Sequence, residues 1–309
     1  LNISGLTKLT EVNCGENLFL QSLDISSNTA LEKLNCSNMM HQGMLSDLVL
    51  GDNGALKSLD CSNNSLTSLG LSKLTGLTQL TCGNNDMESL DVSVLANLKT
   101  LDCSAYSFGG DKGSLTSLVF GDTNTNLTNV RCSNNQLTSL DVSGLTNLKQ
   151  LTCDGNKYTI QVGRDGKFDL SNLPTGFVVA KANNWSGGTV EGNILTVDEN
   201  AAEVTYTYDC GATSKTISNP TFTLLVEKEQ TYAINLENDG NGTASASVAS
   251  AAQSEQVTLT AAPNEGYEFD KWVVEDNKVT LANPNSPMTT FTMPASEVTI
   301  KVSFKKKAA

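Results

Sequence analysis

The sequence predicts a mainly β protein: a solenoid with two short strands in each coil, followed by two small all-β domains. Three observations lead to this prediction. Leucines and cysteines recur with a period near 21 residues in the first half of the chain, short β-type runs fill the middle, and a new aromatic pattern begins near residue 231. Because each change of pattern indicates a separate core, we place the domains at 1–156, 157–229 and 230–309.

Seven cysteines mark the coils, one in each, with steps of 22, 25, 21, 21, 29 and 21 residues: Cys14, Cys36, Cys61, Cys82, Cys103, Cys132 and Cys153. The clearest coil runs from Leu137 to Asn156 and has leucine or valine at positions 137, 140, 142, 145, 148 and 151. This motif resembles the leucine-rich-repeat signature L-x-x-L-x-L-x-x-N, with cysteine in the third apolar position. A single coil cannot bury its apolar side, so neighbouring coils must stack, and seven coils suffice for a stable rod.

Alternating residues predict the strands of each coil. Leu151-Thr152-Cys153 alternates between inward and outward positions, and Leu140-Asp141-Val142 does the same on the opposite side. An asparagine follows the cysteine by three residues in five coils, where its amide can bind backbone groups at a corner: Asn17, Asn64, Asn85, Asn135 and Asn156. Met39 and Tyr106 replace this asparagine in the other two coils.

The two coils without this asparagine are also the longest. Their insertions run through Met40 and His41 and through Tyr106 and Phe108, and both must bulge outward. Loops carried on a rigid scaffold often hold the functional residues. The alternative is that these loops have no role in binding and only compensate for the missing corner asparagine.

The segment 157–229 predicts an all-β sandwich that covers the apolar end of the solenoid. Trp185, Tyr206 and Tyr208 are its expected core. Tyr208-Asp209-Cys210 resembles the tyrosine corner of immunoglobulin domains, but the segment has no second cysteine. The likeness to immunoglobulin domains is therefore loose.

Three motifs stand in the last segment: V-T-L-T-A at 257–261, G-Y-E-F-D-K-W at 266–272 and F-T-M-P at 291–294. They resemble the B-repeat module of bacterial internalin-type surface proteins, and the resemblance implies a spacer. Because a small domain needs bulky core residues, we assign its large aromatic residues to the core and not to a ligand platform. These residues are Tyr267, Phe269, Trp272, Phe291 and Phe304.

The cysteines predict no redox or metal chemistry. Each cysteine of the repeat is the inward member of an alternating pair, so burial should raise its pKa and leave it an inert, free thiol. No C-x-x-C pair occurs, and in-register cysteines on parallel strands have poor torsions for a disulfide. We expect no metal and no cofactor.

Catalysis is equally unsupported. His41 is the only histidine, and no motif supplies it with a nucleophile. Asp60 and Asp102 should lie about 10 Å apart, too far for a retaining glycosidase pair and near the limit for an inverting pair. Asp24, Asp91 and Asp141 would form only an interrupted calcium ladder, because Val49, Gly70 and Val119 stand between them. We therefore expect a protein that is not an enzyme.

The net charge of −13 disfavours nucleic acid as a partner. No apolar run approaches the roughly 20 residues that a membrane-spanning helix needs, so membrane insertion is not expected. The chain opens at Leu1 in mid-pattern, as if a leader had been removed. Together with the internalin-type resemblance, this predicts an extracellular or cell-surface monomer.

Protein recognition by the outward strand face is the favoured function. The candidate residues are Asn35, Asp60, Thr81, Asp102, Arg131 and Thr152 on that face, with Met40, His41, Tyr106 and Phe108 in the insertions. The strip should measure about 30 by 10 Å, which is less than the roughly 800 Å² of a standard interface, so the insertions would have to contribute. Glycan binding, with sugars stacked on Tyr106 and Phe108, and a purely structural spacer role are the alternatives.

Overall fold

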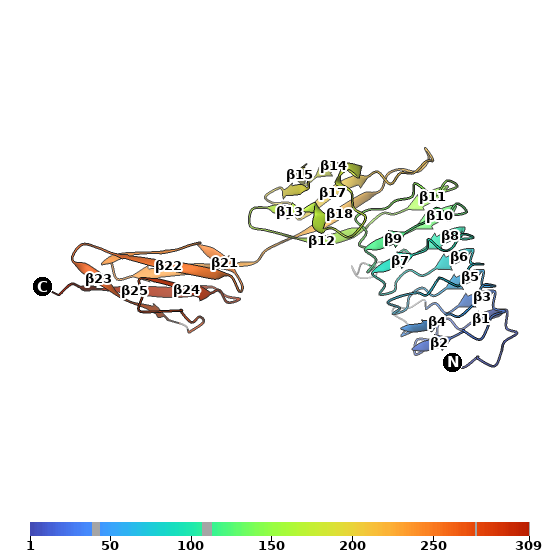
Figure 1. Ribbon diagram of the computed structural model, residues 1–309, viewed down its shortest axis with the longest axis horizontal. Helices are drawn as coiled ribbons and strands as arrows, with labels where there is room; N and C mark the ends of the chain where they lie inside the picture. Colours follow the sequence, from blue (N-terminus) through green and yellow to red (C-terminus); the bar gives the residue numbers. More distant parts are fainter. Residues whose placement is uncertain (39–43, 107–112, 276, 309) are drawn as a thin grey trace. The chain divides into compact units, whose positions relative to one another are not determined.

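The computed structural model describes residues 1–38, 44–106, 113–275 and 277–308. It divides into two compact units, Leu1–Glu227 and Lys228–Ala309. The first unit contains the coils and the segment that follows them, and the second contains the aromatic-rich segment (Figure 1).

One seven-stranded parallel sheet runs along the coils in the order β1-β3-β5-β6-β8-β10-β11. Its strands are β1 (Glu11–Asn13), β3 (Lys33–Asn35), β5 (Ser58–Asp60), β6 (Gln79–Thr81), β8 (Thr100–Asp102), β10 (Asn129–Arg131) and β11 (Gln150–Thr152). The strands pair in register, so that Leu59 lies beside Leu80 and Leu80 beside Leu101, all three fully buried. The mainly β solenoid predicted from the 21-residue period is confirmed.

Shorter ladders form on the opposite side of the coils. β2 (Ser22–Asp24) pairs with β4 (Asp47–Val49), and β7 (Ser89–Asp91) pairs with β9 (Ser117–Val119). The corresponding segments of the fourth and seventh coils bury Leu71, Leu140 and Val142 without forming a strand. The apolar positions therefore hold the coil together even where the second ladder is interrupted.

The corner asparagines bind backbone groups where the chain turns, as predicted, and four of them also bridge consecutive coils. The Asn85 amide donates to the carbonyl oxygens of Cys61 and Cys82 at 3.1 and 3.0 Å. Asn64, Asn135 and Asn156 repeat this pattern and are buried, whereas Asn17, in the first coil, is exposed. These amides satisfy carbonyl groups that the turning backbone leaves unpaired.

A second set of buried asparagines was not predicted. Asn28, Asn53 and Asn124 are fully buried, and each donates to two carbonyl groups of the preceding coil. Other coils have leucine at this position, namely Leu74, Leu95 and Leu145. The same corner is thus closed by an amide in some coils and by an apolar side chain in others.

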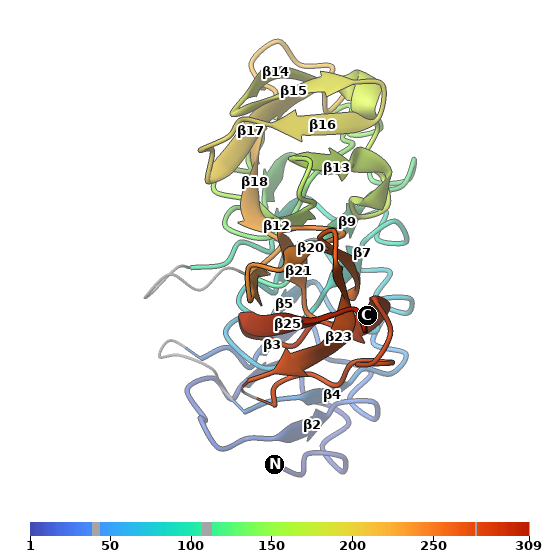
Figure 2. The same ribbon diagram turned by 90° about the vertical axis from the view of Figure 1, so that its left-hand side faces the viewer.

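Two small sheets follow the last coil, β12-β18-β17-β14 and β13-β16-β15 (Figure 2). Their strands are β12 (Lys157–Val162), β13 (Lys167–Asp169), β14 (Ala182–Ser186), β15 (Gly188–Glu191), β16 (Ile194–Val197), β17 (Glu203–Tyr208) and β18 (Thr221–Lys228), with short 3-10 helices η1 (Leu170–Asn172) and η2 (Val179–Lys181). We call this segment, residues 157–227, the cap.

The core of the cap is continuous with the core of the solenoid. Tyr206 and Tyr208 are buried, as predicted, while Trp185 is half-buried and stacks on Tyr206 with ring centroids 4.5 Å apart. Leu145 and Leu148 of the last coil are only 2% and 5% exposed. The apolar end of the coils and the cap therefore share one core.

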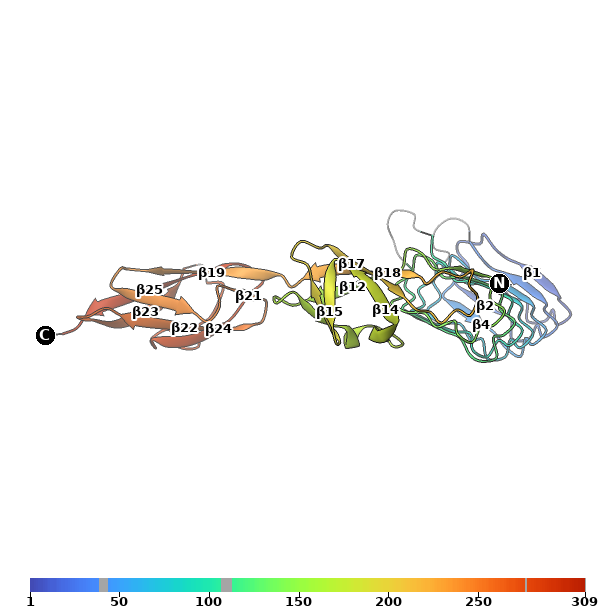
Figure 3. The same ribbon diagram turned by 90° about the horizontal axis from the view of Figure 1, so that it is seen from above.

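The second unit has its own core between two sheets, β21-β19-β25-β23 and β20-β22-β24 (Figure 3). Its strands are β19 (Thr231–Asn238), β20 (Gly242–Ala246), β21 (Ser250–Ala252), β22 (Gln256–Pro263), β23 (Tyr267–Val274), β24 (Met288–Thr292) and β25 (Val298–Lys306). Trp272, Phe291 and Phe304 are buried, and Tyr267 and Phe269 pack against them half-buried. Their assignment to the core is confirmed.

Candidate binding surface and the cap junction

The predicted face is formed by the outward residues of the seven-stranded sheet. Asn35, Asp60, Thr81 and Asp102 are half-buried, whereas Arg131 and Thr152 are exposed. Because the strands pair in register, these residues form one column across the coils. The structure therefore brings the six predicted strand residues together.

Three residues of this column are fixed by turns that the sequence analysis missed. The side-chain oxygens of Asn35, Asp60 and Asp102 accept hydrogen bonds from the backbone N–H two residues later, at 3.0 to 3.1 Å. The donor is a serine each time, and the recurring Asn/Asp-Cys-Ser triplet is the local signal of this turn. These side chains are consequently rigid acceptors on the face.

The face changes character toward the last coils. The Arg131 guanidinium lies 3.8 Å from the Asp102 carboxylate, and its side chain is 61% exposed. Beside it, the Asn129 amide donates to the Gln150 side-chain oxygen. The exposed guanidinium of Arg131 thus lies next in the column after the fixed acceptor side chains of Asn35, Asp60 and Asp102.

Of the residues predicted in the insertions, the structure describes one. Tyr106 is 60% exposed, and its backbone N–H donates to the Asn84 side-chain oxygen at 2.7 Å. Met40, His41 and Phe108 lie outside the described residues. Their role in binding stays a prediction.

The cysteines line the interior as free, buried thiols, as predicted. The Cys36 and Cys103 thiols donate to carbonyl oxygens of the following strand, those of Asp60 and Arg131, at 3.5 and 3.4 Å. Burial raises the pKa of the Cys61 thiol to about 12 and raises that of Cys82 well above its ordinary value. A protonated thiol is a poor nucleophile and a poor metal ligand, and these thiols contribute to the packed interior of the coils.

The cap continues the hydrogen bonding of the coils on the side of the second strands. The Val142 N–H donates to the Cys210 carbonyl at 2.8 Å, just as the Ile25 N–H donates to Val49 and the Val92 N–H to Val119 at 3.0 Å. On this side the cap takes the place of an eighth coil.

The cap also supplies the donor that an eighth coil would have given. Carbonyl groups equivalent to that of Thr138, those of Gln21 and Glu88, accept backbone N–H groups from the next coil. Thr138 instead accepts the Tyr206 hydroxyl at 2.6 Å. A tyrosine side chain therefore replaces a backbone amide.

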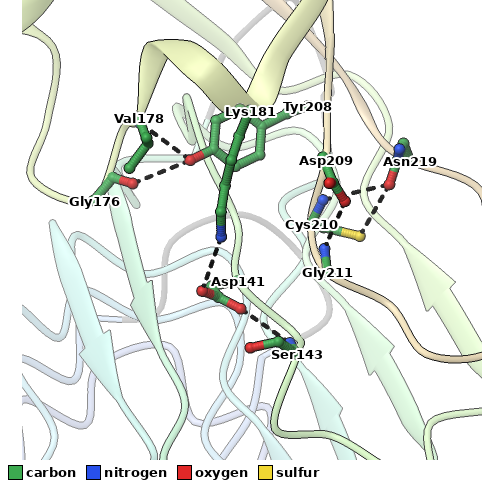
Figure 4. A network of polar contacts seen from close by, with 10 residues as sticks. All are labelled: Asp141, Ser143, Gly176, Val178, Lys181, Tyr208, Asp209, Cys210, Gly211 and Asn219. Carbon is green, nitrogen blue, oxygen red and sulfur yellow. Dashed lines mark hydrogen bonds and ion pairs between the residues drawn. The ribbon is translucent and has the colours of Figure 1, made fainter.

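Polar groups around this junction are paired as well. The Asp141 carboxylate accepts the Ser143 N–H at 2.9 Å and pairs with the Lys181 ammonium at 3.2 Å (Figure 4). The bonds from Ser143 and then the Lys181 ammonium lower the pKa of Asp141. The Tyr208 hydroxyl bonds the backbone at Gly176 and Val178, so it fixes a loop upstream in the manner of a tyrosine corner.

Replacing Tyr206 by phenylalanine should lower the free energy of unfolding by about 1–3 kcal/mol, because the buried Thr138 carbonyl would lose its donor. Urea unfolding would measure the change. Tyr158→Phe is the control, since the half-buried Tyr158 hydroxyl has no hydrogen-bond partner among the described residues. Equal effects of the two substitutions would contradict the role given to Tyr206.

Within the described ranges, no group of three His, Cys, Asp or Glu residues is placed to hold a metal ion. Nor does that part of the chain contain a helix long and apolar enough to span a membrane.

The stacked coils, their inward leucines and cysteines, and the β cap define a leucine-rich-repeat solenoid. Residues 232–308 match the family described as Divergent InlB B-repeat domain. The match confirms the B-repeat module predicted from the sequence, and the chain is internalin-like in this respect.

Two solved structures from Listeria monocytogenes are similar to the chain, and both are internalins. The functional domain of InlJ, described as including a cysteine ladder, is 24% identical, with 74% of this chain and 64% of that chain covered and a TM-score of 0.33. InlP is 15% identical, with 74% of this chain and 90% of that chain covered and a TM-score of 0.24. The chain thus spans less than two thirds of the InlJ structure. No curated protein matches the chain.

Proposed function

We propose that this chain is a non-catalytic, extracellular or cell-surface binding protein that recognises protein partners through the outward face of its solenoid sheet. One observation carries the proposal: seven strands in register present a continuous polar column whose members come from seven different coils. A surface of this kind is held by the stacked core and not by the bound partner. Binding therefore requires little ordering of the protein, which favours affinity.

Arg131 is the expected anchor of this face. Arginine is enriched among the residues that dominate protein interfaces, because its guanidinium combines charge with a large flat contact surface. Its ion pair with Asp102 spans 3.8 Å, and the Arg131 side chain remains mostly exposed. A partner carboxylate could thus reach Arg131 without first breaking a buried bond.

The B-repeat module is proposed as a spacer. Its large aromatic residues are committed to its own core, so they offer no exposed platform for a ligand. Recognition is accordingly assigned to the first unit.

Arg131→Ala should weaken the binding of a protein captured from a host or bacterial surface about tenfold, the effect of about 1.4 kcal/mol typical of an interface anchor. Surface plasmon resonance with the captured partner would measure it. Lys73→Ala is the matched control, because Lys73 also forms a 3.8 Å ion pair with a carboxylate, that of Asp52, but lies off the sheet.

Equal loss of affinity in the two variants would contradict the strand-face proposal. The neutral hydrogen-bonding residues of the face, including Thr81 and Thr152, also suit a sugar. A glycan array run beside the capture experiment separates the two ligand classes, since hits on glycans with no captured protein would favour the glycan alternative. A chain that binds neither would fit the spacer role.

A further inference from the structure

The last strand of the seven-stranded sheet, β11, has a free edge. It pairs only with β10, to which the Gln150 N–H and the Thr152 carbonyl are bonded. In a parallel ladder alternate residues turn their backbone groups to opposite neighbours. Lys149, Leu151 and Cys153 therefore direct backbone groups away from β10, toward the edge.

In every earlier coil these groups are bonded to the next coil. The carbonyl groups of Lys99 and Thr128, equivalent to that of Lys149, accept N–H groups from the following strand. The Cys132 N–H, equivalent to that of Cys153, donates to Thr152. Throughout the described residues, no backbone or side-chain group bonds the Lys149 carbonyl, the Leu151 N–H and carbonyl, or the Cys153 N–H. These four backbone groups of β11 therefore lack the hydrogen-bond partner that the next coil provides for the equivalent groups in earlier coils.

The cap replaces an eighth coil on one side only. Near the second strands Cys210 and Tyr206 complete the bonding of the last coil. Along β11, by contrast, a hollow of about 360 Å³ separates residues 149–154 from residues 216–221 of the cap. The hollow lines β11, the last strand of the sheet, where an eighth strand would continue it.

We propose that this hollow binds an extended polypeptide segment of a partner protein, which adds to β11 as an eighth strand. Along the edge stand the Lys149 carbonyl, the N–H and carbonyl of Leu151, and the Cys153 N–H. An extended backbone carries the complementary alternation of donors and acceptors at the same spacing. Sugar hydroxyls have no such fixed alternation, and the net charge of −13 disfavours a nucleic-acid strand.

The surrounding side chains indicate what segment would fit. The cap wall is lined mostly by polar residues, with two apolar residues, Ile217 and Pro220, among them. Lys149 and Asp154 stand at opposite ends of the edge. The free groups span positions 149 to 153, so a segment of about five residues would satisfy them. A segment with mostly small polar side chains and an apolar side chain that contacts Ile217 and Pro220 suits this wall.

This site differs from the strand face, because it uses backbone groups at the edge of the sheet and not the outward side chains. The two proposals can therefore fail separately. Arg131→Ala tests the face, whereas blocking the hollow tests the edge.

The test begins with a phage library of random seven-residue peptides selected on the full chain. Selected peptides should bind the wild type but lose at least tenfold in affinity for Ser218→Trp, in which the new side chain fills the hollow. Ser27→Trp, at another exposed serine, which follows β2, is the matched control and should bind normally.

Backbone recognition is then tested on the peptides themselves, which leaves the protein unchanged. N-methylation at every second residue should reduce affinity at least tenfold, and N-methylation at the intervening residues should not. Hydrogen exchange of the Leu151 and Cys153 amides should slow at least tenfold when the peptide is bound.

The absence of selected peptides, binding that survives Ser218→Trp, or equal sensitivity to N-methylation at all positions would overturn the proposal. Self-association of the chain that Ser218→Trp abolishes would assign the edge to a second copy and would overturn it as well.

Discussion

Above pH 9 the free energy of unfolding of this chain should fall by about 7 kcal/mol for each pH unit, because five deeply buried thiols keep their protons only in the folded state. These are Cys36, Cys61, Cys82, Cys103 and Cys132. For the first four, burial is the main cause of the raised pKa; for Cys132 the hydrogen bond with Cys153 comes first and burial second. In the unfolded chain the same thiols ionise near pH 9.

The sign follows from the raised pKa values. Below pH 9 both states hold the protons, and the stability is fully present. Above it the unfolded chain releases about one proton per thiol, which favours unfolding by about 1.4 kcal/mol per pH unit for each. The loss continues until the folded thiols ionise, which for Cys61 occurs near pH 12.

Urea unfolding at pH 8, 9 and 10 would measure this slope. Cys61→Ala should reduce it by about 1.4 kcal/mol per pH unit, since one ionisable group is removed. Leu59→Ala, a buried neighbour in the same coil, should lower stability at every pH and leave the slope unchanged. A total slope smaller than that expected for a single thiol would show that the sulfur atoms are not held in a dry interior.

The coil was predictable because its information is local and repeated. Leucines at spacings of two and three residues can share one side only on the inside of a coil, and the period then fixes which residues lie side by side. Leu80 and Leu101, 21 residues apart, are indeed partners in the sheet. The corner asparagines followed for the same reason, since their spacing from the cysteine is constant.

Two features of the coils escaped prediction for different reasons. The turn at Asp60-Cys61-Ser62 has a local signature, so the sequence alone could have revealed it. The buried Asn53, however, takes the place of leucine in other coils, and only the structure shows which carbonyl groups its amide meets. An asparagine at a position where other coils have leucine is the sequence signal of such a buried, hydrogen-bonded amide.

No local sequence pattern predicts the contacts between the cap and the last coil. Tyr206 and Thr138 are 68 residues apart, and no sequence motif around either residue indicates that the two are in contact. The free edge of β11 is likewise a property of what the cap does not cover. For the candidate face, alternation predicted which side chains point outward, but not that Arg131 would pair with Asp102.

Asn85→Ala should lower the free energy of unfolding by about 2 kcal/mol or more, because two buried backbone groups, the Leu66 N–H and the Cys82 carbonyl, would lose their partner. The Cys61 carbonyl, by contrast, keeps the Asn64 amide. The Asn85 amide donates to the Cys61 and Cys82 carbonyl groups, and its side-chain oxygen accepts the Leu66 N–H at 3.0 Å. One side chain thus ties two consecutive coils at their corner. Urea unfolding at pH 7 would measure the loss.

Asn17→Ala is the matched control. Asn17 makes the same local bonds in the first coil, to the Cys14 and Gly15 carbonyl groups at 2.7 and 3.1 Å, but it is exposed. Water can satisfy those carbonyl groups when the amide is removed, so the expected loss is below about 1 kcal/mol. If the two substitutions cost the same, the corner amides would stabilise the coil only through local turns, and the stacking of coils would depend on the leucines and cysteines alone.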